Sequence, residues 1–225
     1  MINSIFGNSG WSMITDALIT VIPALICITI HELAHGFTAY RLGDRTAKDM
    51  GRLTLNPIRH IDVIGMLMLL VFKFGWAKPV PVDMRNFKKP RLGMAVTAFA
   101  GPLSNTALAA VILFVYGLVF VPLGGLFGPA PGRIILSIIE RTAYLSVALA
   151  VFNLIPFPPL DGSKVLFSFL SDRMYFKLMH YERYGIFILL IIMNTPVFSM
   201  TVGCLTVELY NILFVIARTA FGFVN

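Results

Sequence analysis

Five consecutive residues, His31-Glu32-Leu33-Ala34-His35, carry the side chains that most directly suggest chemistry. In a helix, His31 and His35 lie on one face because residues i and i+4 are neighbours, so both imidazoles can bind one metal ion. Glu32 lies one residue further round, where its carboxylate can reach a water molecule without binding the metal. The pattern therefore predicts a metal centre formed by two histidines, with Glu32 as general base.

The surroundings of this motif distinguish a metal site from a chance match. In soluble proteins the same five-residue pattern is often an exposed helix face. Here it lies within ITVIPALICITIHELAHGFTAY, a segment that is otherwise apolar. Ionisable side chains at membrane depth are costly and by default mark function. We therefore interpret the two histidines as metal ligands.

A third ligand must come from elsewhere in the chain. A metzincin would need Gly at position 38 and His at position 41, where this sequence has Thr38 and Arg41. Asp161 lies in NLIPFPPLDG, after an apolar run, and two histidines with one carboxylate leave a fourth position open, as in catalytic zinc sites. Asp161 is also compatible with a helix N-cap, and it can serve both roles. The glutamates that a thermolysin-like site would require lie in no supporting motif: Glu140, Glu182 and Glu208.

The composition places the chain in a membrane. Of its 225 residues, 57% are hydrophobic and 13% are charged, against about 45–50% and 25% in soluble domains. The apolar runs are long and continuous, which favours spanning helices over a barrel. Lys and Arg concentrate between Arg41 and Arg91, which predicts a cytosolic loop and an outward N-terminus. No aromatic-interleaved basic motif accompanies the net charge of +7, so we expect no nucleic acid partner.

Apolar runs and their breaks predict the elements that position the site. The run 61–74 is shorter than the roughly 20 residues needed to cross a bilayer and favours a re-entrant or interfacial segment. Gly101-Pro102 predicts an interruption of the helix that contains it. The expected helices and apolar runs are 14–42, 93–121, 134–157, 185–200 and 202–217.

These runs predict an all-α polytopic membrane protein with about five to six transmembrane helices plus a short re-entrant segment. The whole chain, 1–225, is expected to form a single integral-membrane domain. Its catalytic core covers about 14–170, and additional C-terminal helices cover about 184–220.

The chain resembles the site-2 protease family of intramembrane zinc metalloproteases. The resemblance rests on HELAHG, on Leu160-Asp161-Gly162 and on the asparagine eight residues before Asp161. GRLTLNPIRHIDVIG and the GPLSN of 101–105 look like the compact bacterial branch without a PDZ domain. The resemblance implies a zinc ion (Zn2+) bound by His31, His35 and Asp161. It also implies that Glu32 and Asn153 are catalytic, with Asn153 holding the scissile carbonyl or its oxyanion.

The same resemblance implies a substrate, a location and partners. Peptide bonds within or near transmembrane segments of membrane proteins would be hydrolysed, in a bacterial plasma membrane. The basic loop and the short distance from Arg41 to the histidines separately predict an active site toward the cytosol. A re-entrant loop between Gly51 and Phe74 would lie near the site and offer a strand edge to substrate. The partners would be transmembrane protein substrates and the lipid bilayer, with a homo-oligomer left open. The expected substrate-binding residues are Gly51, Leu53, Leu55 and Asn56.

Two alternatives remain open at this point. A non-proteolytic membrane metal-binding or transport protein could use the same histidine pair, although a transporter would be expected to carry ionisable residues on several helices. A membrane zincin acting on prenylated or soluble peptides could use a glutamate as third ligand. An assay that compares variants of Asp161 with variants of each glutamate decides whether the third ligand is the aspartate or a glutamate.

Overall fold

The computed structural model describes residues 8–72, 77–126 and 129–223. Within these ranges the regular structure is helical, apart from one isolated antiparallel bridge between Ile61 and Ala77. The predicted all-α class is therefore confirmed. The elements are α2 (Asn8–Arg41), α3 (Thr46–Asp49), η1 (Pro57–Arg59), α4 (Val63–Phe72), η2 (Met84–Asn86), α5 (Pro90–Leu126), α6 (Pro129–Leu154), α7 (Asp161–Phe167), α8 (Asp172–Met193) and α9 (Pro196–Gly222).

Four helices in the described ranges are long and apolar enough to cross a membrane. Only 11–28% of the most apolar window of each is buried inside the protein, so large apolar side chains cover the outer surface of the bundle. Soluble monomers rarely expose apolar surface on this scale, which makes lipid the natural solvent. The spans are Leu18–Arg41, Pro90–Pro122, Gly132–Leu154 and Pro196–Gly222.

The predicted count of five to six transmembrane helices exceeds these four because the run 185–200 does not form one element. The apolar part of α8 covers only Tyr184–Met193, which is too short to span. The chain turns at Asn194 and Thr195, and the Thr195 side chain accepts the N–H of Phe198 as the N-cap of α9. With ten residues, α4 is also too short to span. Its re-entrant placement stays a prediction, and residues 73 and 74 of that run lie outside the described residues.

The predicted interruption at Gly101-Pro102 is wrong, since α5 runs continuously through both residues. Proline is tolerated in membrane helices where nearby side chains and neighbouring helices satisfy the disturbed backbone. Pro102 removes only the backbone hydrogen bond to the Ala98 carbonyl, and the turns on either side of it stay helical. Because α5 is uninterrupted, one face of it packs continuously against α2.

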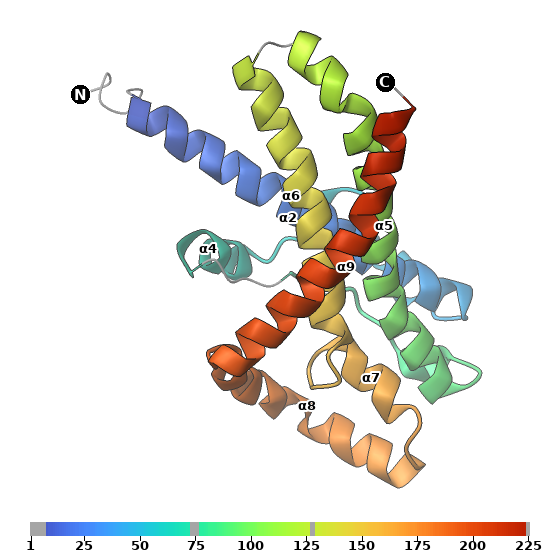
Figure 1. Cartoon of the computed structure of the whole chain (residues 1–225). Coiled ribbons are helices and arrows are strands. Elements are labelled where there is room, and N and C mark those ends of the chain that lie inside the picture. The colour runs from blue at the N-terminus through green and yellow to red at the C-terminus, as the bar shows by residue number, and fades with distance from the viewer. Residues whose placement is uncertain (1–7, 73–76, 127–128, 224–225) are drawn as a thin grey trace.

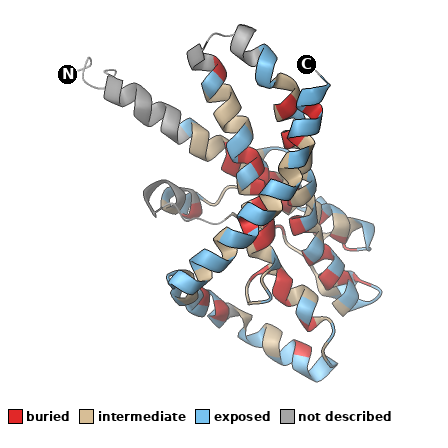
Figure 2. Cartoon of the chain, viewed as in Figure 1, coloured by how far each residue is buried: buried red, intermediate tan, exposed pale blue. Residues whose placement is uncertain are grey.

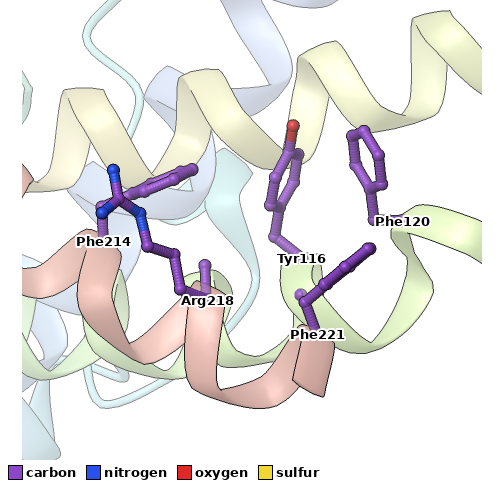
Figure 3. A pocket seen from close by; sticks show the side chains of 7 residues that line it. Tyr116, Phe120, Phe214, Arg218 and Phe221 are labelled. Carbon is purple, nitrogen blue, oxygen red and sulfur yellow. The ribbon is translucent and has the colours of Figure 1, made fainter. Parts of the chain in front are cut away.

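The spanning helices cross near the middle of the molecule, while α7 and α8 lie together at one end (Figure 1). Buried residues gather at this crossing, and the outer faces of α8 and α9 are exposed (Figure 2). Small residues let the backbones approach closely. At Gly117 in α5, a Cβ would overlap the Ala217 carbonyl of α9. Figure 3 shows the apolar pocket beside this contact, where Arg218 lies over the ring of Phe214.

One buried carboxylate fixes the loop between α4 and α5 against the end of α2. Asp44 is fully buried and accepts hydrogen bonds from the backbone N–H groups of Thr46 and Asp83 and from the Asn86 amide. Burial raises the pKa of Asp44, but these bonds outweigh burial and hold the pKa below its usual value. Asp44 therefore stays ionised at neutral pH and holds residues 83–86 in place.

Candidate metal centre

The two histidines and the aspartate of the predicted triad lie together. His31 and His35 project from α2, and Asp161 opens α7 just after α6 ends. The Asp161 Oδ2 atom is 3.1 Å from the Nε2 atom of each histidine. The ligand atoms of the three residues all lie within 4.8 Å of one another, and this is the one such group found among the described residues. The fold therefore brings together residues 130 positions apart in the sequence.

The orientation of His35 provides a test of whether a cation fits. Its Nδ1 atom is 2.8 Å from the Thr97 carbonyl oxygen, which can only accept, so Nδ1 carries a hydrogen. In the neutral ring, Nε2 then directs a lone pair toward the Asp161 carboxylate. A lone pair facing an anionic oxygen at 3.1 Å is unfavourable, and a cation between them removes the conflict. Two imidazole nitrogens and one carboxylate oxygen are donors that zinc takes in catalytic sites.

Asp161 is suited to remain an anion in this setting. Lys164, one turn along α7, brings its Nζ to 3.9 Å from Asp161 Oδ1, and a nearby positive charge favours the ionised carboxylate. An ionised carboxylate is the form that binds a cation. As the first residue of α7, Asp161 also places its negative charge at a helix N-terminus.

Glu32 lies beside the donor group and is held by the backbone of a loop. Its Oε2 atom accepts the N–H of Val80 at 2.7 Å. The buried Arg52 fixes this loop, since its Nη2 donates to the carbonyls of Lys78 and Pro79 at 2.8 and 3.3 Å. A carboxylate that accepts a short backbone bond has a defined orientation. Glu32 therefore faces the site without being one of the three grouped ligands.

These residues line one polar cleft of about 220 Å³. Asn153 from α6 is on its wall, and its Nδ2 donates to the Leu149 carbonyl at 3.0 Å, which leaves its second N–H available. Pro79, Val80 and Lys164 also line the cleft, and sequence reasoning did not identify them. The lining residues are His31, Glu32, His35, Pro79, Val80, Met94, Thr97, Ala98, Asn153, Pro159, Asp161 and Lys164.

The four predicted substrate-binding residues, Gly51, Leu53, Leu55 and Asn56, are not among the residues that line this cleft. Leu53 packs over Gly36 of α2, and Leu55 lines a separate apolar pocket with Leu25 and Ile26. The neighbouring Arg52 instead acts indirectly, by holding the loop that contacts Glu32. Substrate contact at 51–56 stays a prediction.

The glutamates considered as alternative third ligands do not join the histidines. Glu182 pairs with Lys164 at 3.6 Å. Within the described residues, Glu140 and Glu208 also lie outside the grouped ligands. The geometry therefore favours Asp161 as the third ligand.

Gly101 gives the first expected result. A Cβ on Gly101 would lie 2.6 Å from the Cε1 of His31 and 2.5 Å from that of His35, so Gly101→Ala must displace both rings. We expect zinc affinity to fall at least about tenfold, the lower bound for disturbing the groups that orient metal ligands. Competition with a chelator of known affinity measures the effect. Gly203→Ala is the matched control because nothing lies within 4 Å of its added Cβ; equal losses in both variants would contradict this account of Gly101.

The fold and the site together define a helical membrane protein with a metal centre of the metallopeptidase type. The profile of peptidase family M50 matches residues 19–193. Because this match covers most of the chain, the chain belongs to peptidase family M50, the site-2 protease family. The resemblance found in its motifs is thereby confirmed.

Individual relatives agree with this membership. YwhC of Bacillus subtilis (strain 168), named as a candidate zinc metalloprotease, is 40% identical over 185 residues, which cover 80% of this chain and 81% of the relative. Rip2 of Mycolicibacterium smegmatis, named in the same way, is 28% identical over 176 residues, which cover 76% of this chain and 65% of the relative. No solved structure matches the chain at a significant level.

Proposed function

We propose that the protein is an intramembrane zinc metalloprotease that hydrolyses peptide bonds within or near transmembrane segments of membrane proteins. The observation that carries the proposal is the convergence of two imidazoles and one carboxylate beside Glu32, in a helix that is apolar enough to span a bilayer. Membership of peptidase family M50 and relatives named as candidate zinc metalloproteases support the metal and the reaction.

The residues of the cleft can be given roles in this reaction. When bound by His31, His35 and Asp161, zinc supplies a Lewis acid for the peptide carbonyl and lowers the pKa of water. Glu32 takes a proton from the attacking water molecule and delivers it to the leaving amine nitrogen. The Val80 N–H keeps the Glu32 carboxylate oriented. The second amide N–H of Asn153 donates to the oxyanion that develops on the carbonyl oxygen.

The position of the cleft along α2 supports a cytosolic approach of water. His35 lies six residues before Arg41, or about 9 Å along the helix axis, and the basic stretch that follows is typical of the cytosolic side. A substrate helix must unwind there, because its own hydrogen bonds otherwise protect the scissile bond. Among the described residues of the 41–91 region, Pro79 and Val80 border the cleft.

Reconstitution tests this proposal against the transport alternative. Purified full-length protein in lipid nanodiscs would be loaded with zinc and given a transmembrane test substrate or a soluble peptide of the same sequence around the cleavage site. We expect cleavage of the membrane substrate, loss of cleavage with a chelator and recovery with zinc. Zinc movement into proteoliposomes, with no cleavage of either substrate, would instead establish a transporter.

A further inference from the structure

Asn105 is a fully buried polar residue of α5 beside the metal centre, and the proposed reaction gives it no role. Its Nδ2 atom is 3.2 Å from Nδ1 of His31, the ring nitrogen that faces away from Asp161. Its Oδ1 atom is buried and has no hydrogen-bond partner in the described part of the chain. The one hydrogen bond that this side chain makes in the described part of the chain is therefore the bond to His31.

The assignment of the two amide atoms decides what Asn105 does to His31. Amide nitrogen and oxygen have nearly the same shape, so their placement follows from the hydrogen bonds that they make. An amide nitrogen facing Nδ1 would force Nδ1 to accept and would put the ring hydrogen on Nε2, where it blocks metal binding. Rotating the amide by half a turn presents Oδ1 to Nδ1–H and frees the Nε2 lone pair.

The register of α5 against α2 supports the second arrangement. Thr97, Gly101 and Asn105 are spaced by four residues and so share one face of α5. Opposite them, Thr97 contacts His35, Asn105 contacts His31, and Gly101 lies between the two rings. The Thr97 carbonyl is already an acceptor for Nδ1–H of His35. If Asn105 also presents an acceptor, each histidine donates its Nδ1–H to α5 and leaves its Nε2 lone pair free.

We propose that Asn105 is a positioning residue whose side-chain oxygen accepts the Nδ1–H of His31 and so directs Nε2 toward the metal. The inference rests on the zinc site of the proposed function. Ligating histidines commonly donate their second ring N–H to such an acceptor, and removing it typically lowers metal affinity by about 10–100-fold.

A purely structural role in joining α5 to α6 explains the side chain less well. Ser146 of α6 does bond to Asn105 at 2.8 Å, but it donates to the backbone carbonyl. Every amino acid offers that carbonyl, so this contact does not require an amide side chain. The side chain itself points to His31.

The test compares side chains that keep or remove the acceptor in the full-length protein. Asn105→Asp retains an acceptor and loses the amide donor, whereas Asn105→Leu has a similar volume and loses both. We expect zinc affinity, measured by chelator competition, to fall about 10–100-fold in the leucine variant and to stay within about threefold of wild type in the aspartate variant. Co2+ absorption should show the wild-type ligand field for the aspartate variant alone. If the leucine variant does not fold, Asn105→Ala replaces it, with the same expected loss.

Ser146→Ala is the matched control, since it removes a buried hydrogen bond to the backbone of Asn105 and should leave zinc affinity unchanged. Equal affinities for wild type and the leucine variant would overturn the inference and leave the zinc site intact. Equal losses in the leucine and aspartate variants would assign Asn105 a donor or packing role and also overturn it. A wild-type protein that binds no zinc would instead refute the proposed function, and the inference with it.

Discussion

Replacing Glu32 with glutamine is expected to abolish hydrolysis while zinc still binds. Glutamine keeps the length of the side chain and an oxygen that can accept the Val80 N–H, but it cannot take a proton from water. Removing a general base typically lowers rates by about 10²–10⁴-fold, so we expect cleavage to fall at least about 100-fold. Metal analysis and cleavage of a transmembrane test substrate measure the two quantities on one preparation.

Glu208→Gln is the matched control for this result. Glu208 is an exposed glutamate of α9 outside the grouped ligands, so its replacement should change neither zinc content nor cleavage. If Glu32→Gln cleaved at the wild-type rate, another group would have to be the base. Zinc loss in the same variant would instead make Glu32 a ligand.

Replacing Asp161 with alanine is expected to remove both zinc and activity. The Asp161 carboxylate supplies one of three ligand atoms and the only negative charge among them. Its loss should weaken zinc binding by more than the roughly 10–100-fold that outer-shell changes cause. Zinc stoichiometry after dialysis and titration with a chelator measure the effect, and cleavage should fall below detection.

Asp172→Asn is the control for Asp161→Ala, because it also removes an aspartate from the first position of a helix. Asp172 opens α8 as Asp161 opens α7, and it pairs with Arg91 at 2.8 Å on the surface. This variant should keep its zinc. An Asp161→Ala protein with full zinc content and activity would show that the third ligand lies elsewhere and would revive the glutamate alternatives.

The sequence predicted those residues of the site whose side chains belong to recognisable motifs. The spacing of His31 and His35 follows from helix periodicity alone. Helix periodicity could not identify Asp161, because it does not relate the segment after α6 to α2. Elimination of the glutamates and the family resemblance named it, and the structure brings its carboxylate to both imidazoles.

The residues that sequence reasoning missed act through the backbone or through the register of two helices. Val80 contributes a backbone N–H, and Thr97 contributes a backbone carbonyl. Every residue has this carbonyl, and every residue except proline has this N–H, so the residue type does not reveal the role. Gly101 and Asn105 lie in the GPLSN motif, which predicted a helix interruption at Gly101 and a helix–helix contact at Asn105 but placed neither beside the histidines. Their roles depend on which face of α5 meets α2, and hydropathy does not specify that face.

The number of spans was the least predictable feature of the fold. The run 185–200 carries no charged side chain, yet the turn at Asn194 and Thr195 divides it between two helices. Hydropathy averages over such a turn, whereas the capping hydroxyl of Thr195 defines it.

The separation of the ligands along the chain has a consequence for biosynthesis. His31 and Asp161 are 130 residues apart, and ribosomes add roughly 5–20 residues per second. The aspartate therefore follows the histidine out of the ribosome after a delay on the order of 10 s. During this delay the histidine helix can already be in the bilayer, but its metal centre lacks the carboxylate. A complete set of ligands, and with it any hydrolysis at this centre, therefore has to wait until α6 and the start of α7 have been made.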